Sequence, residues 1–409
     1  MLTKLRYGID SEVEFDLPET TLVAHCDASR GEPIRDVAEA VRTALANPLD
    51  FPPLAKSVVI GDKVAIALEH GVPQAAQLIA GIVESLLTAE ILPEDITIVR
   101  TQADDPANDP RAALSEDLRS RVDLLTHDST TREQLAYLGA SARAKPIYLN
   151  RQICEADAVI PVGVARVDSS MGYTGPASGV FPTFSDEQTA QRYRAPRLLE
   201  SAERLEKLRA LADEAQWLLG VLFAIQVVPG RSPELLHIVA GRTDLVYTRS
   251  QELCEAAWRF TVPHRASVVV AAVEGTNGCQ TWDNLARALF AASHSVTEDG
   301  AIVLCTDLAA SAGPATQRLC GADDVDDALR EISKERPVDS LVAAELAHAL
   351  QRGPIYLISQ LDETLVEELG IANVAGEEEL ARLVARHDSC ILLANAQHAV
   401  AIPEGEASL

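Results

Sequence analysis

The sequence contains no apolar run approaching the roughly 20 residues that a helix needs to cross a bilayer. Its start, MLTKLRYGIDSEVEFDL, has no hydrophobic signal-peptide segment, so we expect a cytoplasmic protein with no membrane contact. Basic residues are scarce: 35 Lys and Arg stand against 61 Asp and Glu, a net charge of -26 with a pI near 4.7. This shortage argues against nucleic acid as a partner, because phosphates are bound by clustered lysines and arginines.

Paired cysteine motifs and nucleotide fingerprints are also missing. The seven cysteines are an odd number with no CxxC spacing, which predicts free, mostly buried thiols. No GxGxxG follows an expected strand, so the dinucleotide fingerprint is absent. An anionic small molecule would therefore have to bind in a local pocket, against the negative field of the whole chain.

The chain is long enough for two cores. With 409 residues, 47% of them hydrophobic, it predicts two domains. Pro263 to Arg265 looks like a hinge before an apolar, β-branched run at residues 266–273. We therefore expect an N-terminal α/β domain at residues 1–262 and a C-terminal α/β domain at residues 263–409.

Hydrophobic periodicity places strands and helices in alternation. The expected strands are two short ones within residues 5–19, then 63–68, 95–100, 147–150, 158–164, 221–228, 236–240, 266–273 and 301–305. The expected helices are 32–45, 74–88, 132–138, 202–219 and 281–292. This pattern is typical of an α/β fold with mixed and parallel sheets.

The stretch from Asp157 to Phe184 joins a strand to a glycine-rich loop. Residues 158–164 are apolar and rich in β-branched side chains, as in a strand buried on both faces. In the loop that follows, glycines alternate with hydroxyl side chains, so backbone amides can turn towards a small anion. Ligands of open α/β sheets bind where strands end, and we expect this loop to line the ligand site.

The loop sequence GYTGPAS, Gly172 to Ser178, resembles the Gly-Phe-Ser-Gly-Gly-x-Lys loop of the nickel-dependent lactate racemase family. In that family the lysine anchors a nickel pincer nucleotide, and a histidine shortly before the first glycine transfers a proton. Ser178 stands at the lysine position and Asp168 at the histidine position. The resemblance runs through nearly the whole chain and implies two α/β domains with a cleft between them.

Three further positions follow from the same resemblance. The loop from Thr101 stands where the family carries its other catalytic histidine, and Asp104 takes that place. A nickel-ligating histidine falls on Arg194, whose guanidinium has no lone pair for a metal. A substrate-contacting lysine falls on Arg287, for which an i,i+4 ion pair with Asp283 is the alternative role.

Acidic residues of the expected cleft form a second candidate site. Glu69, at an aspartate position of the family, would lie with Asp104 and Asp168 and would raise a carboxyl pKa or recruit a cation. With His70 and Asp105 these residues suit magnesium, manganese or calcium, since hard oxygen ligands favour these ions over nickel. A pair of solvated turn formers is the alternative interpretation of the two vicinal aspartates.

Two histidine motifs also draw attention. His25, Cys26 and Asp27 look like a catalytic cluster, but neighbours on an extended chain point to opposite faces, so a loop at a strand end is the preferred interpretation. His127 lies in a segment that resembles one near the cleft of the racemase family. We interpret it as a structural hydrogen-bonding residue.

Three functional hypotheses remain open. The first is a divergent racemase or epimerase of a small 2-hydroxy acid or sugar acid, with Asp104 and Asp168 as acid and base and Arg287 holding the carboxylate. The other residues expected to bind substrate or anion are Gly172, Thr174, Gly175, Ser178, Arg194 and Glu69. The second is a non-catalytic relative that binds a ligand or supports an assembly, and the third is an enzyme with a hard divalent metal.

The cofactor is left open by the sequence. Because the lysine anchor is Ser178 and the histidine ligand is Arg194, we expect that the chain does not use the tethered nickel nucleotide. The expected partner is a small anionic molecule, and the sequence predicts no oligomeric state.

Overall fold

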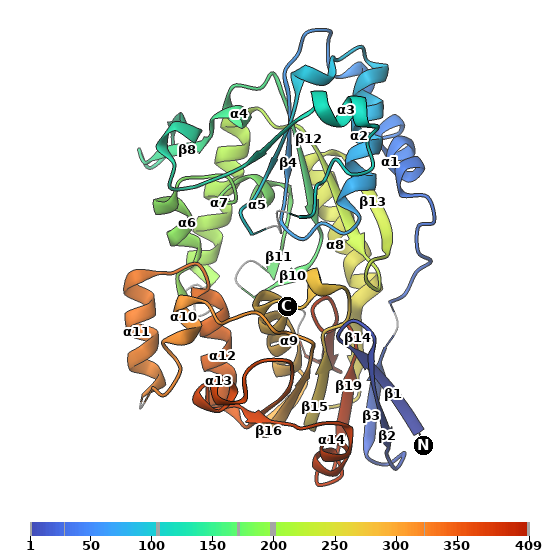
Figure 1. Ribbon diagram of the computed structural model, residues 1–409, viewed down its shortest axis with the longest axis vertical. Coiled ribbons are helices and arrows are strands. Elements are labelled where there is room, and N and C mark those ends of the chain that lie inside the picture. Colours follow the sequence, from blue (N-terminus) through green and yellow to red (C-terminus); the bar gives the residue numbers. More distant parts are fainter. Residues whose placement is uncertain are drawn as a thin grey trace.

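Two six-stranded sheets, stacked along the long axis of the molecule, form the framework (Figure 1). The computed structural model describes residues 2–27, 29–103, 107–169, 172–196, 202–322 and 324–406. The arrangement confirms the predicted α/β class with mixed and parallel sheets. None of the helices in these ranges is long and apolar enough to span a membrane.

The first sheet has the strand order β13-β12-β9-β4-β5-β6 and is parallel except for the pair β12 and β13. Its strands are apolar because both faces are covered; every residue of β4 is buried, for example. The bounds are β4 Val64–Leu68, β5 Ile96–Arg100, β6 Asp123–Thr126, β9 Ala158–Val164, β12 Phe223–Pro229 and β13 Leu235–Arg242.

Helices cover both faces of the first sheet. On one face, α1 (Val37–Ala46) and α2 (Ala75–Thr88) bury one apolar stripe each. The other face is packed by side chains of α4 (Arg151–Cys154), α5 (Pro176–Val180), α6 (Glu187–Tyr193) and α7 (Ala202–Leu219). The short α3 is Glu116–Arg121, and α8 (Thr243–Trp258) packs on β12 and β13.

The second sheet is parallel throughout, with the order β18-β17-β16-β15-β19-β3. Its strands are β3 Leu22–Cys26, β15 Ala266–Ala272, β16 Val296–Cys305, β17 Ile355–Ile358, β18 Ala372–Asn373 and β19 Cys390–Leu393. One face packs on α9 (Trp282–Ser293), α11 (Val325–Glu335) and α12 (Ser340–Arg352), and the other on α14 (Glu377–Val384). The remaining short helices are α10 Pro314–Gln317 and α13 Glu363–Glu368.

Four two-stranded ribbons complete the fold. They are β1 Leu2–Tyr7 with β2 Ser11–Asp16, β7 Leu135–Ala140 with β8 Pro146–Asn150, β10 Val167–Asp168 with β11 Gly172–Tyr173, and β14 Arg259–Val262 with β20 Val400–Pro403. The pair β14 and β20 joins the hinge segment to the C-terminal segment.

The first strands of the chain belong to the second sheet. The predicted boundary placed residues 1–262 in one domain, but β3 pairs with β19, and Leu5, Val13 and Phe15 of the β1-β2 hairpin are buried against β15 and β16. The alternating pattern of this hairpin predicts a buried face without indicating which sheet will cover it. The N-terminal part of the predicted boundary is therefore wrong.

Two predicted helices differ from the structure. Residues 132–138 form a 3₁₀ turn, Arg132–Gln134, followed by β7, where Tyr137 packs against Tyr148 of β8 with ring centroids 5.7 Å apart. This cross-strand packing outweighs the weak helical pattern. The helix expected at 32–45 starts at Val37, because the Asp36 carboxylate accepts from the Glu39 amide at 2.9 Å and caps it. The other expected strands and helices are present with small shifts of their ends.

The strand order creates a place for a ligand. From β4 the chain moves outwards to β5 and β6, and it later returns on the other side of β4 as β9. The segments leaving β4 and β9 run to opposite faces, since α2 packs on one face and α5 on the other. Such a switch point leaves a crevice at the carboxyl ends of the two strands. In the second sheet β15 has the same position, between β16 and β19.

Gly241 of β13 lies very close to the backbone of Leu49. It has φ +143°, and a Cβ there would lie 2.4 Å from the backbone N and O of Leu49. We expect Gly241→Ala to lower the free energy of unfolding well beyond Gly220→Ala, where φ is +72° and nothing lies within 4 Å. The control should cost about 1 kcal/mol for backbone strain alone. Equal losses in urea unfolding would show that the contact with Leu49 is easily displaced.

Candidate functional site

A buried ion pair occupies the switch point of the first sheet. Glu69 follows β4 and Arg166 follows β9; Glu69 Oε1 and Arg166 Nη2 are 2.7 Å apart, and the side chains are only 10% and 13% exposed. The other carboxylate oxygen accepts from the Val164 amide at 3.1 Å, and Arg166 Nη1 donates to the His70 carbonyl at 3.4 Å. These contacts fix the direction of the guanidinium in the crevice.

The glycine-rich loop is fastened to the same strand end. The Thr174 hydroxyl donates to the Val164 carbonyl at 2.6 Å and accepts from the Arg166 amide at 3.3 Å. The Gly175 amide donates to the Ser178 hydroxyl at 3.0 Å, and that hydroxyl donates back to the Gly175 carbonyl at 2.8 Å. Gly175 has no room for a side chain, since a Cβ would lie 2.5 Å from the Tyr247 ring of α8.

A buried glutamine adds an acceptor to this cluster. Gln226 of β12 donates through Nε2 to the Thr174 carbonyl at 3.3 Å and is 1% exposed. Its Oε1 and the Nε of Arg166 are buried, and neither has a hydrogen-bond partner in the part of the chain that the structure describes. Because buried polar groups are nearly always hydrogen bonded, each of these two atoms could take a further polar partner.

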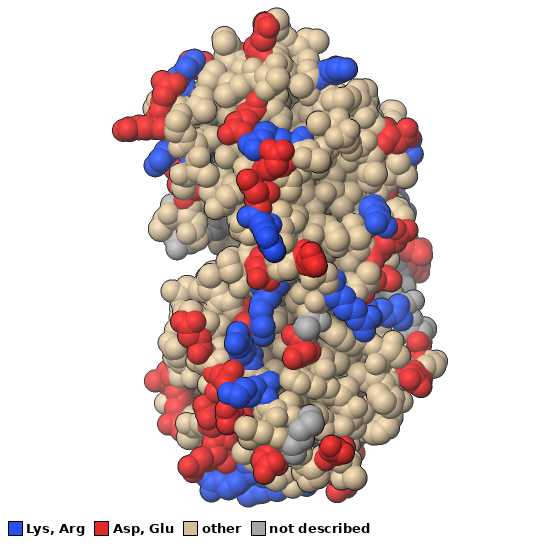
Figure 2. Space-filling model, turned by 90° about the vertical axis from the view of Figure 1, so that its right-hand side faces the viewer, with Lys and Arg blue, Asp and Glu red and all other residues tan. Residues whose placement is uncertain are grey.

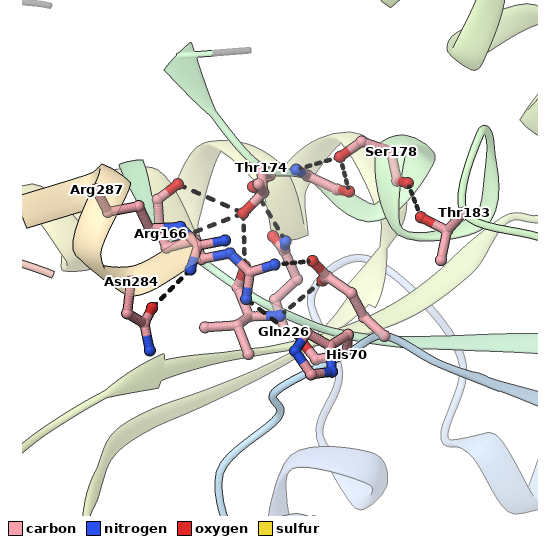
Figure 3. A network of polar contacts seen from close by, with 11 residues as sticks. His70, Arg166, Thr174, Ser178, Thr183, Gln226, Asn284 and Arg287 are labelled. Atoms are coloured by element: carbon pink, nitrogen blue, oxygen red, sulfur yellow. Dashed lines mark hydrogen bonds and ion pairs between the residues drawn. The ribbon is translucent and has the colours of Figure 1, made fainter. Parts of the chain in front are cut away.

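A second guanidinium reaches the junction from the other sheet. Arg287 lies in α9, whose first residues follow the carboxyl end of β15, and its Nη1 donates to Asn284 Oδ1 at 2.7 Å. Asn284 is itself held by the Cys279 carbonyl at 2.8 Å. Figure 3 shows Arg166 and Arg287 pointing into the same region, with Gln226 and His70 nearby.

His398 has a buried ring nitrogen, Nδ1. It follows β19, and its ring lies against Trp258 with centroids 5.6 Å apart. Burial, and then the charges of Arg287 and Arg166, lower the pKa of His398 to about 3. The imidazole is therefore neutral at pH 7.

An ion pair joins the two sheets beside this cluster. Arg231, in the turn between β12 and β13, bonds through Nε to the Glu274 carboxylate at 2.8 Å; Glu274 follows β15. The Asn395 and Gln397 side-chain amides, from the segment after β19, donate to Glu274 at 2.9 and 2.7 Å. The carboxyl ends of the central strands of both sheets therefore meet at one junction.

Both signs of charge are present at the junction. On the face in Figure 2, Lys and Arg side chains lie along the middle of the molecule, with Asp and Glu side chains between them. Within the cluster, the Arg166 guanidinium is paired with the Glu69 carboxylate, and the Arg287 guanidinium donates to the Asn284 side chain. Guanidinium groups bind small anions at short range even in a chain whose net charge is -26.

Comparison with known proteins identifies the N-terminal half. A model of the lactate racemase N-terminal domain matches residues 7–205. Residues 7–205 belong to the lactate racemase N-terminal domain family. No curated protein sequence matches the chain.

Solved structures extend the likeness to the whole fold. The lactate racemase apoprotein of Thermoanaerobacterium thermosaccharolyticum is similar with a TM-score of 0.81 and 16% identity, covering 98% of this chain and 100% of that chain. A Thermotoga maritima protein gives a TM-score of 0.67 and 13% identity, covering 91% of this chain and 99% of that chain. At these identities the comparison shows a shared fold, with the lactate racemase N-terminal domain forming its first half.

The structure places only some predicted residues of the lactate racemase loop together. Glu69, Thr174 and Arg287 lie at the junction, and Gly175 and Ser178 start α5 beside it. Asp168 and Gly172 pair through their backbones in the β10-β11 ribbon, and the Asp168 side chain lies outside the description. The predictions for Asp104 and Asp105 fall outside the described residues.

Arg194 has a local partner. It follows α6, and its Nη1 lies 2.9 Å from Glu187 Oε1 of the same helix. The donor groups at the family's cofactor positions do not fit a tethered nickel nucleotide: Ser178 offers a hydroxyl used in its own helix turn, and Arg194 has no lone pair.

The structure also bears on the predicted acidic metal site and on the cluster at residues 25–27. Glu69 is paired with a guanidinium, so it is not the open carboxylate that a hard-metal site needs. The described residues contain no group of three or more metal-ligating side chains, though the side chains of Asp104, Asp105 and Asp168 are outside this description. Cys26, the last residue of β3, is buried, and burial raises the pKa of its thiol to about 12, so it is a core residue at the strand end.

The most informative residues of the junction were missed by the sequence analysis. Arg166, Gln226 and His398 come from three segments that are far apart in sequence, and none lies in a motif. Arg166 stands two residues before Asp168, so its position at the carboxyl end of β9 could have indicated a role. For Gln226, the unusual feature is a polar side chain within an apolar strand.

A separate hollow lies at the opposite end of the first sheet. It has a volume of about 210 Å³ and is lined by the amino-terminal ends of β4 and β5, with Lys63, Glu94, Asp95, Asp123 and Glu155 among its residues. It is remote from the arginines, and Glu94 is already paired with Arg121. We assign no function to it.

The Glu69–Arg166 pair should matter for stability. We expect Glu69→Gln to lower the free energy of unfolding by about 3 kcal/mol, because a buried guanidinium loses its counter-charge. Glu84→Gln is the matched control, since it breaks the exposed ion pair with Arg42, and it should cause a much smaller loss. Similar losses in the two variants during urea unfolding would contradict a role for burial.

The buried His127 should make the free energy of unfolding depend on pH. It is buried, its Nε2 donates to the Ser185 carbonyl at 3.0 Å, its Nδ1 accepts from Asn150, and burial lowers its pKa. As the pH falls below about 6.5, the unfolded chain binds a proton that the folded His127 does not, so folding loses stability. We expect His127→Gln to lose less stability than the wild type between pH 7.5 and 5.5.

The control for this measurement is His264→Gln, at an exposed histidine. It should keep the wild-type dependence of the unfolding free energy on pH. If His127→Gln shows the same loss as wild type, the buried histidine contributes nothing to acid sensitivity.

Proposed function

We propose that this chain is a divergent racemase or epimerase of the lactate racemase family that acts on a small 2-hydroxy acid without the tethered nickel nucleotide. The observation that carries the proposal is the convergence of Arg166 and Arg287, from the two halves of the molecule, beside the open acceptor of Gln226. A 2-hydroxy acid has the complementary groups: a carboxylate for guanidinium donors and a hydroxyl for an amide oxygen.

Each group of the substrate has a specific partner in this proposal. The Nε of Arg166 faces the ligand as a fixed donor, because the Nη groups are held by Glu69 and His70. Arg287 supplies the second guanidinium, and a planar fork binds a carboxylate better than an ammonium group does. Gln226 Oε1 accepts from the 2-hydroxyl, since its amide nitrogen is already bonded to Thr174.

Proton transfer is assigned to two aspartates by resemblance. Asp168 and Asp104 stand at the positions of the two catalytic histidines of the family. One carboxylate would remove the α-proton from one face of the substrate carbon, and the other carboxyl would return a proton to the opposite face. A carboxylate with an ordinary pKa near 4 is a weak base for this step, so the mechanism requires a raised pKa in the closed site.

The reaction is proposed without nickel because the cofactor ligands have changed together. The Ser178 hydroxyl is used in capping α5, and Arg194 is paired with Glu187. The same observation supports a second candidate, a non-catalytic relative that binds the same anion. In that case the junction binds 2-hydroxy acids without inverting them.

Substitution of Arg287 tests whether this residue binds the anionic substrate. We expect Arg287→Met to weaken binding of L-lactate, D-lactate or D-glycerate at least tenfold, because one charged hydrogen-bonding group is lost. Isothermal titration calorimetry measures this change, and Arg330→Met, which breaks an exposed ion pair with Asp327 on α11, should leave binding unchanged. Unaltered affinity in Arg287→Met would exclude this residue from the site.

Turnover is followed by chiral chromatography of the bound acids after incubation. Inversion by the wild type that disappears in Asp168→Asn and Asp104→Asn, while binding persists, supports the racemase. Binding without inversion in the wild type supports the second candidate. Absence of binding for every acid in the panel overturns both.

A further inference from the structure

The direction of the Arg287 side chain follows from its place in the helix. Arg287 lies in the second turn of α9, and the side chains of a helix lean towards its amino-terminal end. That end follows the carboxyl end of β15, near the junction of the two sheets. The guanidinium therefore reaches back to the first turn of its own helix, where Asn284 lies three residues earlier on the same face.

Asn284 joins Arg287 to the turn that precedes the helix. Its Oδ1 accepts from Nη1 of Arg287 at 2.7 Å (Figure 3), and its Nδ2 donates to the Cys279 carbonyl at 2.8 Å. A guanidinium can only donate and a carbonyl can only accept, so a bridge between them needs a side chain with both an acceptor and a donor. The planar amide meets this need, and the two contacts allow it one orientation.

The backbone around Asn284 is held as well. Its amide donates to the Thr281 hydroxyl, which caps α9, at 3.2 Å. Cys279 ends a 3₁₀ turn, and its Sγ lies 3.4 Å from Oγ of Ser232, in the turn between β12 and β13 of the first sheet. The acceptor that orients Arg287 is therefore fixed by contacts within the second half of the chain and by one contact with the first half.

We propose that Asn284 is a positioning residue, which holds the Arg287 guanidinium in the direction in which it binds the carboxylate of a small organic anion. The proposal rests on the proposed function, in which Arg287 binds that carboxylate. It adds a residue to which neither the glycine-rich loop nor the family resemblance gives a role. An arginine that is already held in place loses less side-chain freedom on binding than one that can rotate.

The neutral charge of the amide is part of this role. Asn284→Asp keeps an acceptor for Arg287, but it turns an oxygen towards the Cys279 carbonyl, which has no proton to donate. Its negative charge also offsets the charge of Arg287 and repels the carboxylate of the ligand. We therefore expect Asn284→Asp to bind an anion more weakly than Asn284→Ala does.

The test uses the full chain and L-lactate as the probe. In titration calorimetry, Asn284→Ala should raise the Kd about two- to twelvefold over the wild type, because the ligand must then order Arg287. Asn284→Leu, which has nearly the shape of asparagine without its polar atoms, should show the same loss. Asn373→Ala, at an asparagine whose Nδ2 lies 3.4 Å from Glu363 Oε1, should bind as the wild type does. Thermal unfolding checks that each variant is folded.

A double-mutant cycle separates positioning from a general structural effect. When Arg287 is replaced, substitution of a residue that acts only through Arg287 has no further effect on binding. The Kd of the double variant with Arg287→Met and Asn284→Ala should therefore equal that of Arg287→Met alone. A rise of the Kd by the same factor in both backgrounds would show that Asn284 affects binding by another route, and this would overturn the proposal.

A further measurement uses the wild type alone. Arginine side-chain NMR of the protein without ligand should show separate signals for the two Nη groups of Arg287, because its contact with Asn284 hinders their exchange by rotation. The signals are assigned by their loss in Arg287→Met. A single averaged signal in the free protein would show that the guanidinium is not held, and this would also overturn the proposal.

The outcomes distinguish this inference from the function on which it rests. A wild-type Kd in Asn284→Ala, together with weakened binding in Arg287→Met, overturns the role of Asn284 and leaves the proposed function standing. Unaltered affinity in Arg287→Met removes Arg287 from the site and removes this inference with it. Absence of binding of L-lactate and the other acids of the panel to the wild type overturns both.

Discussion

The buried ion pair between Glu69 and Arg166 is the constraint on which the junction depends. Removing two charges from water is costly, and the cost is offset only when the pair is close and its remaining atoms are hydrogen bonded. Val164 and His70 supply those bonds from the backbone of the adjoining strand ends. The pair therefore ties the end of β4 to the end of β9 and holds the Arg166 guanidinium in place, so stability and the candidate site depend on the same contact.

The second sheet contributes the opposite wall by the same structural rule. Its central strands also end at the junction. There Glu274 forms an ion pair with Arg231 and accepts hydrogen bonds from Asn395 and Gln397. Because both sheets present carboxyl ends there, short loops deliver polar side chains from each half without long excursions of the chain. The apolar packing of α8, β14 and β20 next to them keeps the two halves in contact.

Much of the fold could be predicted from the sequence, because its signals are local. The apolar run at 158–164 and the amphipathic stretch at 202–219 correspond to β9 and α7. The sheet to which β3 belongs was not predictable. Alternating hydrophobic residues in the β1-β2 hairpin indicate that one face is buried, but they do not indicate which sheet packs against that face. The same limit applies to the site: Arg287 was found through resemblance, whereas Gln226 and His398 become informative only when distant strand ends are brought together.

The changes at the family's cofactor positions are consistent with one another. A chain that lacked only the anchoring lysine would keep a nickel-ligating histidine but could not tether the cofactor. A chain that lacked only the histidine would tether the cofactor without a ligand for its nickel. By the resemblance, Ser178 and Arg194 stand at these two positions and Arg287 at that of the substrate-contacting lysine; in the structure Ser178 and Arg194 bond to neighbours in their own segments. A guanidinium keeps its charge at every working pH and binds a carboxylate through two parallel bonds. A site built on this guanidinium would rely on fixed charge, which in a chain of net charge -26 acts only at short range.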